Sequence, residues 1–392
     1  TEARAALATA RQLFARENDA AAVANVDLQV ATVCLAQQLA PESLELAQAC
    51  IDVFRTHDLP IGRARAYLVA AHAALALDQI EQASRWVGEA LQIGLQHNIP
   101  ALAYQGHYLQ GTLAVTSGSH AAGLVAYDQA VQDLERLCGR LMIEFRADFV
   151  GDKERLYEDT VALCLDMAQP ARGLAYCERA KSRALLDMLA HRLDLSIHAR
   201  SEADRPLVTE LLDLRAERDR LYRRWQIGEG MEQFSQRGAA LGERYAVEQS
   251  VLELEQRITE LWHRLLIRNA DYARDAALWQ VRTEQVQPYL DRETVLLEFY
   301  AVHGQVVVFL VTADGVRAHR LAANLTQVQQ LMRLFWLNLT TVPQSTPARI
   351  VTLISNTRGV LHKLYQLLLQ PLQDELAPCA RLIVVPHGIM HY

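Results

Sequence analysis

Small side chains recur every 40 residues through residues 20–142, and this repeat constrains the fold more than any other feature of the sequence. Small residues at fixed positions allow paired helices to approach closely, and a period of about 20–50 residues is typical of stacked repeats. The sequence therefore predicts a solenoid of paired helices. The recurring positions are Ala31, Ala71 and Gly111, then Cys34, Ala74 and Ala114, and then Cys50, Ala90 and Ala130.

Each unit of this repeat contains two segments with apolar residues at helical spacing, joined by a short polar turn. In the clearest unit the helices cover residues 61–77 and 80–96, and Asp78-Gln79 separates them. A diverged pair follows near residues 154–167 and 171–191. We therefore predict that residues 1–195 form a tetratricopeptide-like α-solenoid, with repeats longer than the usual length of about 34 residues.

Residues 196–280 are rich in charges of both signs. Apolar stripes run from Leu211 to Trp225 and from Val251 to Leu265, and Gly228-Glu229-Gly230 lies between them. Mixed charges around an apolar seam predict an antiparallel helical hairpin, which we interpret as a solvated structural arm. Because the surrounding charge is balanced, the tryptophans of this region are interpreted as packing residues and not as base-stacking platforms. These tryptophans are Trp225, Trp262 and Trp279.

The periodicity changes from helical to strand-like at Thr294. Three runs of β-branched and aromatic residues cover residues 294–301, 305–311 and 316–321. Short glycine turns separate them, which predicts an antiparallel β-meander.

Two helices and a further strand are predicted after the meander. One helix runs from Thr326 to Leu339, opened by a capping box of Thr326 with Gln329. The other covers about residues 350–376, with a break near Asn356–Gly359.

The run Leu382–Val385 is too short for a helix and apolar on both faces, so it predicts a buried parallel strand. His387-Gly388 lies at the carboxyl end of this strand, the edge where sites are assembled in open α/β sheets. Residues 281–392 are thus predicted to be a β-meander followed by the start of an α/β domain. Without a neighbouring strand, Leu382–Val385 would be an aggregation-prone edge.

Composition argues against several classes of function. The formal net charge is −7, so no general positive field favours a nucleic-acid or membrane partner. The longest apolar stretch, Leu68–Leu77, is far shorter than the ~20 residues that span a bilayer. Six cysteines without a C-x-x-C pair indicate core packing in a reducing, cytoplasmic compartment. They are Cys34, Cys50, Cys138, Cys164, Cys177 and Cys379.

Five segments, in order along the chain, resemble the TPR-CHAT family. These are bacterial tetratricopeptide arrays joined to a caspase- and separase-like domain, and the resemblance covers about residues 20–392. The segments are Gly151–Asp159, Glu178–Asp187, Leu290–Tyr300, Leu364–Pro371 and Leu382–His391.

The resemblance implies a cysteine peptidase whose helical array senses a protein or peptide partner in its groove. Its chemistry needs a histidine and a cysteine, and in this family both lie downstream of the segment that ends at His391. The sequence stops at Tyr392 after a strand-like run, so we expect a piece of a longer protein, inactive by itself. No catalytic, cofactor-binding or metal residue is assigned. The alternative is a non-catalytic protein-interaction scaffold.

Individual residues give no stronger site. His387 and His391 are four residues apart, but they follow a strand and no third ligand is indicated, which argues against a metal site. Cys379 precedes the strand and would lie far from either histidine. The other five cysteines lie on predicted solenoid helices, where thiols are usually inert.

The Glu178-Arg179-Ala180-Lys181-Ser182-Arg183 segment holds four charged side chains on one predicted helix. We interpret Glu178, Arg179, Lys181 and Arg183 as interhelical contacts, with a ligand site as the alternative.

Overall fold

The chain divides into two compact units in a computed structural model. One unit comprises Thr1–Asp152 with Ala184–Val281, and the other Lys153–Arg183 with Arg282–Tyr392. Residues 153–183 therefore belong with the sheet, although the sequence suggests that they continue the solenoid. The boundaries at 195 and 280 stay a prediction. The structure describes residues 2–140, 154–190, 199, 201–227, 254, 257–258, 261, 264–265, 286–344 and 346–391.

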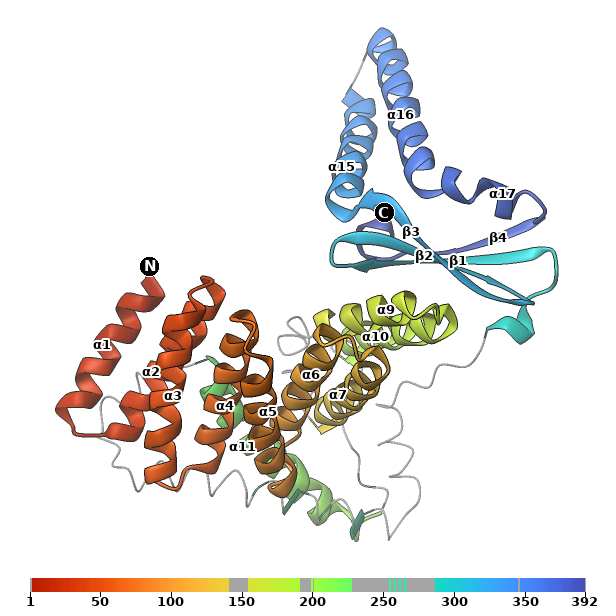
Figure 1. Cartoon of the computed structure of the whole chain (residues 1–392). Coiled ribbons are helices and arrows are strands. Elements are labelled where there is room, and N and C mark those ends of the chain that lie inside the picture. Colours follow the sequence, from red (N-terminus) through yellow and green to blue (C-terminus); the bar gives the residue numbers. More distant parts are fainter. Residues whose placement is uncertain are drawn as a thin grey trace. The chain divides into compact units, whose positions relative to one another are not determined.

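The first unit is a mainly helical, tetratricopeptide-like array in which each helix packs against the next (Figure 1). In addition α2 contacts α4, and α4 contacts α6, as expected of stacked repeats. The predicted helix pairs are confirmed. The helices are α1 (Glu2–Arg16), α2 (Ala20–Ala36), α3 (Ala40–Thr56), α4 (Pro60–Ala76), α5 (Ile80–Gln96), α6 (Pro100–Thr116) and α7 (His120–Arg140).

The turns of this array repeat every 20 residues, half the period of the small residues. At each turn one residue has a positive φ and the next amide donates to the carbonyl five residues earlier, as in a Schellman motif. Asparagine, aspartate and glycine tolerate this conformation best, and Gln38 is the exception in the series. The positive-φ residues are Asn18, Gln38, Asp58, Asp78, Asn98 and Gly118.

The recurring small residues lie where neighbouring helices touch. Ala31 and Ala71 are fully buried. At Gly111, an added Cβ atom would lie only 2.3 Å from Cδ1 of Tyr127 in α7. The aromatic ring therefore occupies the space that a side chain at residue 111 would need, which explains why this position is glycine.

The charged region contains α11 (Arg205–Ile227) and further helical residues between 254 and 265. An ion pair joins α11 to this second helical segment, with Arg257 Nη2 2.9 Å from Glu210 Oε1. The direction of the second helix stays a prediction, and the break at 228–230, Trp262 and Trp279 lie outside the described residues. The shared apolar cluster consists of Leu207, Val208, Leu211, Ile258, Leu261 and Leu265.

The second unit is a four-stranded mixed sheet with helices on both faces. The strand order is β3-β2-β1-β4, with β1 antiparallel to β2 and parallel to β4. The predicted meander and parallel strand are confirmed. The strands are β1 (Thr294–Val302), β2 (Gln305–Thr312), β3 (Gly315–Asn324) and β4 (Arg381–Val385).

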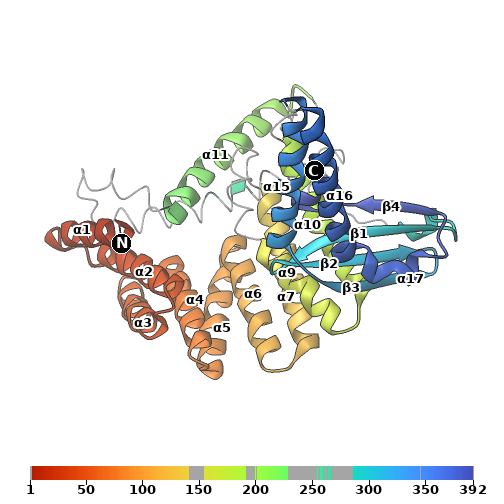
Figure 2. The ribbon, with the colours of Figure 1, turned by 90° about the horizontal axis from the view of Figure 1, so that it is seen from above.

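Two helical pairs cover the sheet. Helices α9 and α10 lie on one face, and α15 and α16 on the other (Figures 1 and 2). The helices are α9 (Glu154–Asp166), α10 (Pro170–Ala190), α15 (Leu325–Thr341), α16 (Pro347–Leu368) and α17 (Gln373–Leu376). Short 3-10 turns cover Gln287–Tyr289, Val342–Gln344, Gln370–Leu372 and Gly388–His391.

Three local predictions are wrong. The side chain of Asn324, not of Thr326, caps α15 by accepting from the amide of Gln327 at 2.7 Å. Helix α16 is continuous through residues 356–359 and ends at Leu368, before Pro371 interrupts helical hydrogen bonding. Leu382–Val384 of β4, one of the two edge strands of the sheet, are exposed and not buried.

Candidate functional site

A buried polar cluster lies between α10 and β1 in the second unit. Side chains alternate along β1, and Val295, Leu297 and Phe299 join the apolar core that includes residues of α15. Glu298 and Tyr300 are therefore directed to the opposite face, where α10 lies. A carboxylate in the middle of an otherwise apolar strand needs a partner, because burying an unpaired charge is unfavourable.

Lys181 of α10 supplies that partner. Its Nζ lies 2.8 Å from Glu298 Oε1, and the two side chains are 17% and 4% exposed. The same ammonium donates to the carbonyl of Pro386 at 3.3 Å, and the Cys177 thiol donates to Glu298 Oε1 at 3.5 Å. One lysine thus ties together α10, β1 and the segment that follows β4.

Glu178 is the second carboxyl group of the cluster. Burial, followed by a hydrogen bond with Glu298 and the negative charge of Glu298, raises the pKa of Glu178 to about 8. Two carboxyl groups can share a hydrogen bond only when one of them holds a proton. At neutral pH Glu178 is therefore the protonated member, and the charge of Glu298 is balanced by Lys181.

The cluster continues to the carboxyl end of β4. The rings of Tyr300 and His387 are 4.8 Å apart between centroids. Burial is the main cause that raises the pKa of Tyr300, so its hydroxyl stays neutral. Helix α9 holds the adjoining β1–β2 turn, because the His303 amide donates to Glu158 Oε2 at 2.8 Å.

This arrangement is suited to clamping segments together and not to nucleophilic catalysis. Burial, and then the charge of Glu298, raise the pKa of the Cys177 thiol well above its ordinary value. A nucleophilic cysteine needs the opposite shift, towards the thiolate.

The structure changes the interpretation of the charged segment on α10. Glu178 and Lys181 contact a strand, and so the predicted interhelical contacts are wrong for these two residues, because α10 packs on the sheet. Arg179 lies over the ring of Tyr176 at 5.3 Å, and the side chain of Arg183 lies outside the described residues. Glu298 was missed as a partner, although a single charge within the apolar run of β1 could have identified it.

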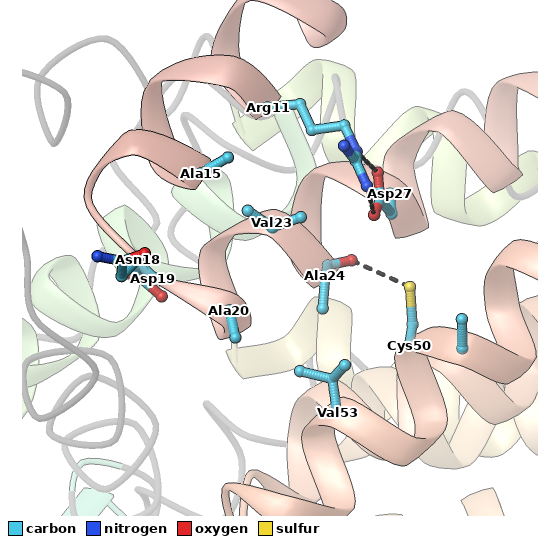
Figure 3. A pocket seen from close by; sticks show the side chains of 11 residues that line it. Arg11, Ala15, Asn18, Asp19, Ala20, Val23, Ala24, Asp27, Cys50 and Val53 are labelled. Atoms are coloured by element: carbon cyan, nitrogen blue, oxygen red, sulfur yellow. Dashed lines mark hydrogen bonds and ion pairs between the residues drawn. The ribbon is translucent and has the colours of Figure 1, made fainter.

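A cavity of about 410 Å³ lies among α1, α2 and α3 in the first unit (Figure 3). Its walls are mostly small and apolar, and Arg11 pairs with Asp27 at its rim, with Arg11 Nε 2.6 Å from Asp27 Oδ1. An apolar hollow with one ion pair can receive a short side chain of a bound peptide. The lining residues are Arg11, Ala15, Asn18, Asp19, Ala20, Val23, Ala24, Asp27, Ala49, Cys50 and Val53.

The remaining candidate residues give no reactive site. Cys50 donates to the Ala24 carbonyl at 3.1 Å, and burial is the main cause that raises the pKa of its thiol to about 12. Cys379 and His387 flank β4 at its opposite ends. Where the structure describes the chain, no three metal-ligating side chains are grouped and no helix is long and apolar enough to cross a membrane.

Comparison with known proteins adds little to this geometry. No protein-family model and no curated protein matches the chain. The apo form of RapI is similar over 65% of this chain and 91% of that chain, at 13% identity and a TM-score of 0.37. A Rap protein complexed with Competence and Sporulation Factor is similar over 64% of this chain and 67% of that chain, at 14% identity and a TM-score of 0.36. Similarity at this level carries no argument about function.

Proposed function

We propose that this chain is the partner-sensing and bracing part of a caspase-like cysteine peptidase of the TPR-CHAT type. The observation that carries the proposal is the convergence of three of the resembling segments in one buried cluster. Lys181, Glu298 and Pro386 belong to three different segments of the resemblance, and Lys181 contacts the other two. Such convergence is expected if the segments define one domain interior, and it supports the resemblance.

The helical array is proposed to bind a protein or peptide partner. Stacked helix pairs present extended surfaces that suit peptides and helices, and the cavity among α1, α2 and α3 is a place for one side chain of such a ligand. The five free cysteines of the described residues fit a reducing, cytoplasmic location.

The test is cysteine-dependent cleavage. The gene is read beyond the codon for Tyr392, and the encoded protein is assayed with its candidate cysteine intact and replaced by alanine. Cleavage that disappears with the cysteine supports the peptidase. Deleting the array then tests its role, since equal cleavage rates with and without it would rule out partner sensing.

A non-catalytic scaffold is the second candidate. It needs no reactive residue, and the described cysteines Cys50 and Cys177 are inert, as they would also be in the proposed peptidase. It predicts that the protein binds partners through the array while no extended reading frame supplies a histidine and cysteine at strand ends. Cleavage that requires a cysteine would exclude it.

A further inference from the structure

The cavity among α1, α2 and α3 combines aliphatic walls with one ion pair. All three helices contribute alanine or valine side chains to its walls (Figure 3). Its volume of about 410 Å³ is enough for a small organic molecule, since such sites measure roughly 300–1,000 Å³. The walls therefore suit a ligand with a compact aliphatic body. The aliphatic residues are Ala15, Ala20, Val23, Ala24, Ala49 and Val53.

The ion pair at the rim keeps hydrogen-bonding groups that a ligand can use. Arg11 donates twice to Asp27, from Nε to Oδ1 at 2.6 Å and from Nη2 to Oδ2 at 3.2 Å. A guanidinium has more N–H groups than these two bonds use, and each carboxylate oxygen can accept a further hydrogen bond. The side chains of Arg11 and Asp27 are 53% and 18% exposed, so a ligand can reach both.

An ion pair favours a ligand that carries charges of both signs. A lone cation beside Asp27 would be repelled by Arg11, and a lone anion beside Arg11 would be repelled by Asp27. A zwitterion can lie antiparallel to the pair, with its anionic group at Arg11 and its cationic group at Asp27, so that both contacts are attractive.

Asp19 is the third charged residue of the lining, and it has a structural task. Its Oδ1 accepts from the amide of Ala22 at 2.8 Å and caps the N-terminus of α2. Figure 3 shows Asp19 on a different side of the cavity from the pair of Arg11 and Asp27. The two charges that a ligand meets together at the rim are therefore those of the ion pair.

We propose that this cavity binds a free aliphatic α-amino acid of the size of valine or leucine. A single carbon atom separates the carboxylate and the ammonium of such a ligand, so the two groups can contact Arg11 and Asp27 together. The aliphatic side chain then packs against the alanine and valine walls, where its removal from water favours binding. This inference does not depend on the proposed function, since a peptidase and a scaffold can both carry such a site.

Three probes of similar shape separate the two charges of the ligand. Leucine carries both, leucinamide carries only the ammonium, and isocaproate carries only the carboxylate. Binding of each probe to the 392-residue chain is measured by isothermal titration calorimetry at low salt, because salt screens an exposed ion pair. We expect leucine to bind at least about tenfold more tightly than either singly charged probe.

Substitutions in the ion pair should give opposite preferences between the singly charged probes. Asp27→Asn leaves the charge of Arg11, so isocaproate should bind more tightly than leucinamide. Arg11→Gln leaves the charge of Asp27, so leucinamide should bind more tightly than isocaproate. Both variants should bind leucine at least about tenfold more weakly. A pair that only joins α1 to α2 would not produce this exchange.

A larger side chain in the wall tests the aliphatic part of the site. Ala49→Leu should reduce the affinity for leucine at least about tenfold, because the added atoms occupy the cavity. Ala49 is exposed, so the substitution does not disturb the buried core. Ala122→Leu is the matched control, since Ala122 is an exposed alanine of α7 outside the cavity. Circular dichroism confirms that each variant keeps its helical content.

Several results would overturn the proposal. They are the absence of leucine binding at millimolar concentrations, equal affinity for the three probes, and leucine binding that Ala49→Leu leaves unchanged. Tighter binding of a singly charged probe than of leucine to the unsubstituted chain would also refute the assignment of a zwitterion.

Discussion

Replacing Lys181 by methionine tests whether the cluster between α10 and β1 is an electrostatic clamp. Methionine keeps most of the aliphatic volume but removes the charge that balances Glu298. Glu298 cannot turn to water, because it lies in the middle of β1 and is almost fully buried. The variant must therefore either bury an unpaired carboxylate or take up a proton.

Proton uptake sets the magnitude. An ordinary glutamate has a pKa of about 4.3, and each pH unit corresponds to about 1.36 kcal/mol. Protonating Glu298 at pH 7 therefore costs about 3.7 kcal/mol, close to the range of about 3–5 kcal/mol for breaking a buried ion pair. At pH 5 the same step costs only about 1 kcal/mol. The destabilisation should thus shrink by more than half between pH 7 and pH 5.

Hydrogen exchange of the β1 amides, measured by mass spectrometry, reports the local free energy of opening. Lys181→Met combined with Glu298→Gln should recover most of the loss, because no buried charge then remains. Lys363→Met is the matched control, since Lys363 is an exposed lysine of the same unit. A loss of stability that does not change with pH, or that the second substitution fails to reduce, would refute the electrostatic argument.

Other expected outcomes concern pH and the repeat array. Because the folded-state pKa of Glu178 is raised to about 8, its stabilising contribution is complete below its unfolded pKa and is lost as pH rises through about 8. Glu178→Gln should flatten this decline in urea midpoints between pH 5 and pH 8, and an unchanged slope would contradict the assignment. Gly111→Ala should destabilise the array by about 1–3 kcal/mol through overpacking. Gly88→Ala should instead raise stability by up to about 1 kcal/mol, because no atom lies within 4 Å of its added Cβ atom; equal melting temperatures would disprove the packing argument. Gln38→Gly should stabilise its turn by about 0.5–1 kcal/mol, and Gly118→Ala should destabilise the turn at residue 118, because both residues have a positive φ. The two variants should shift the melting temperature in opposite directions.

The helix pairs could be predicted from the sequence because their cause is local. Each series of small residues 40 apart falls on every second helix, at a position where a neighbouring helix approaches closely. Ala31 of α2 and Ala71 of α4 are examples. The finer period of 20 residues is also visible, as asparagine, aspartate or glycine at most turns. It was missed because Gln38 interrupts the series and because the buried small residues do not follow it.

The buried cluster could not be predicted in the same way. Lys181 and Glu298 are far apart in the sequence, and no local pattern states which face of α10 meets the sheet.

The sequence predicts β4 as a parallel strand, but it does not predict that the side chains of β4 are exposed. Its apolar residues imply burial, but the side chains of a strand are buried by what packs on the two faces of the sheet, and the strand pattern does not state how far that covering reaches.

A buried polar cluster makes residues that are far apart in the sequence depend on one another. Lys181 pairs with Glu298, and Glu178 shares a hydrogen bond with it, so a change at one of these residues affects the others. These contacts therefore stabilise a domain interior and do not identify a reaction. A scaffold that never cleaves a substrate would need the same contacts. Variants in the cluster accordingly measure stability, and the dependence of cleavage on a cysteine is what separates peptidase from scaffold.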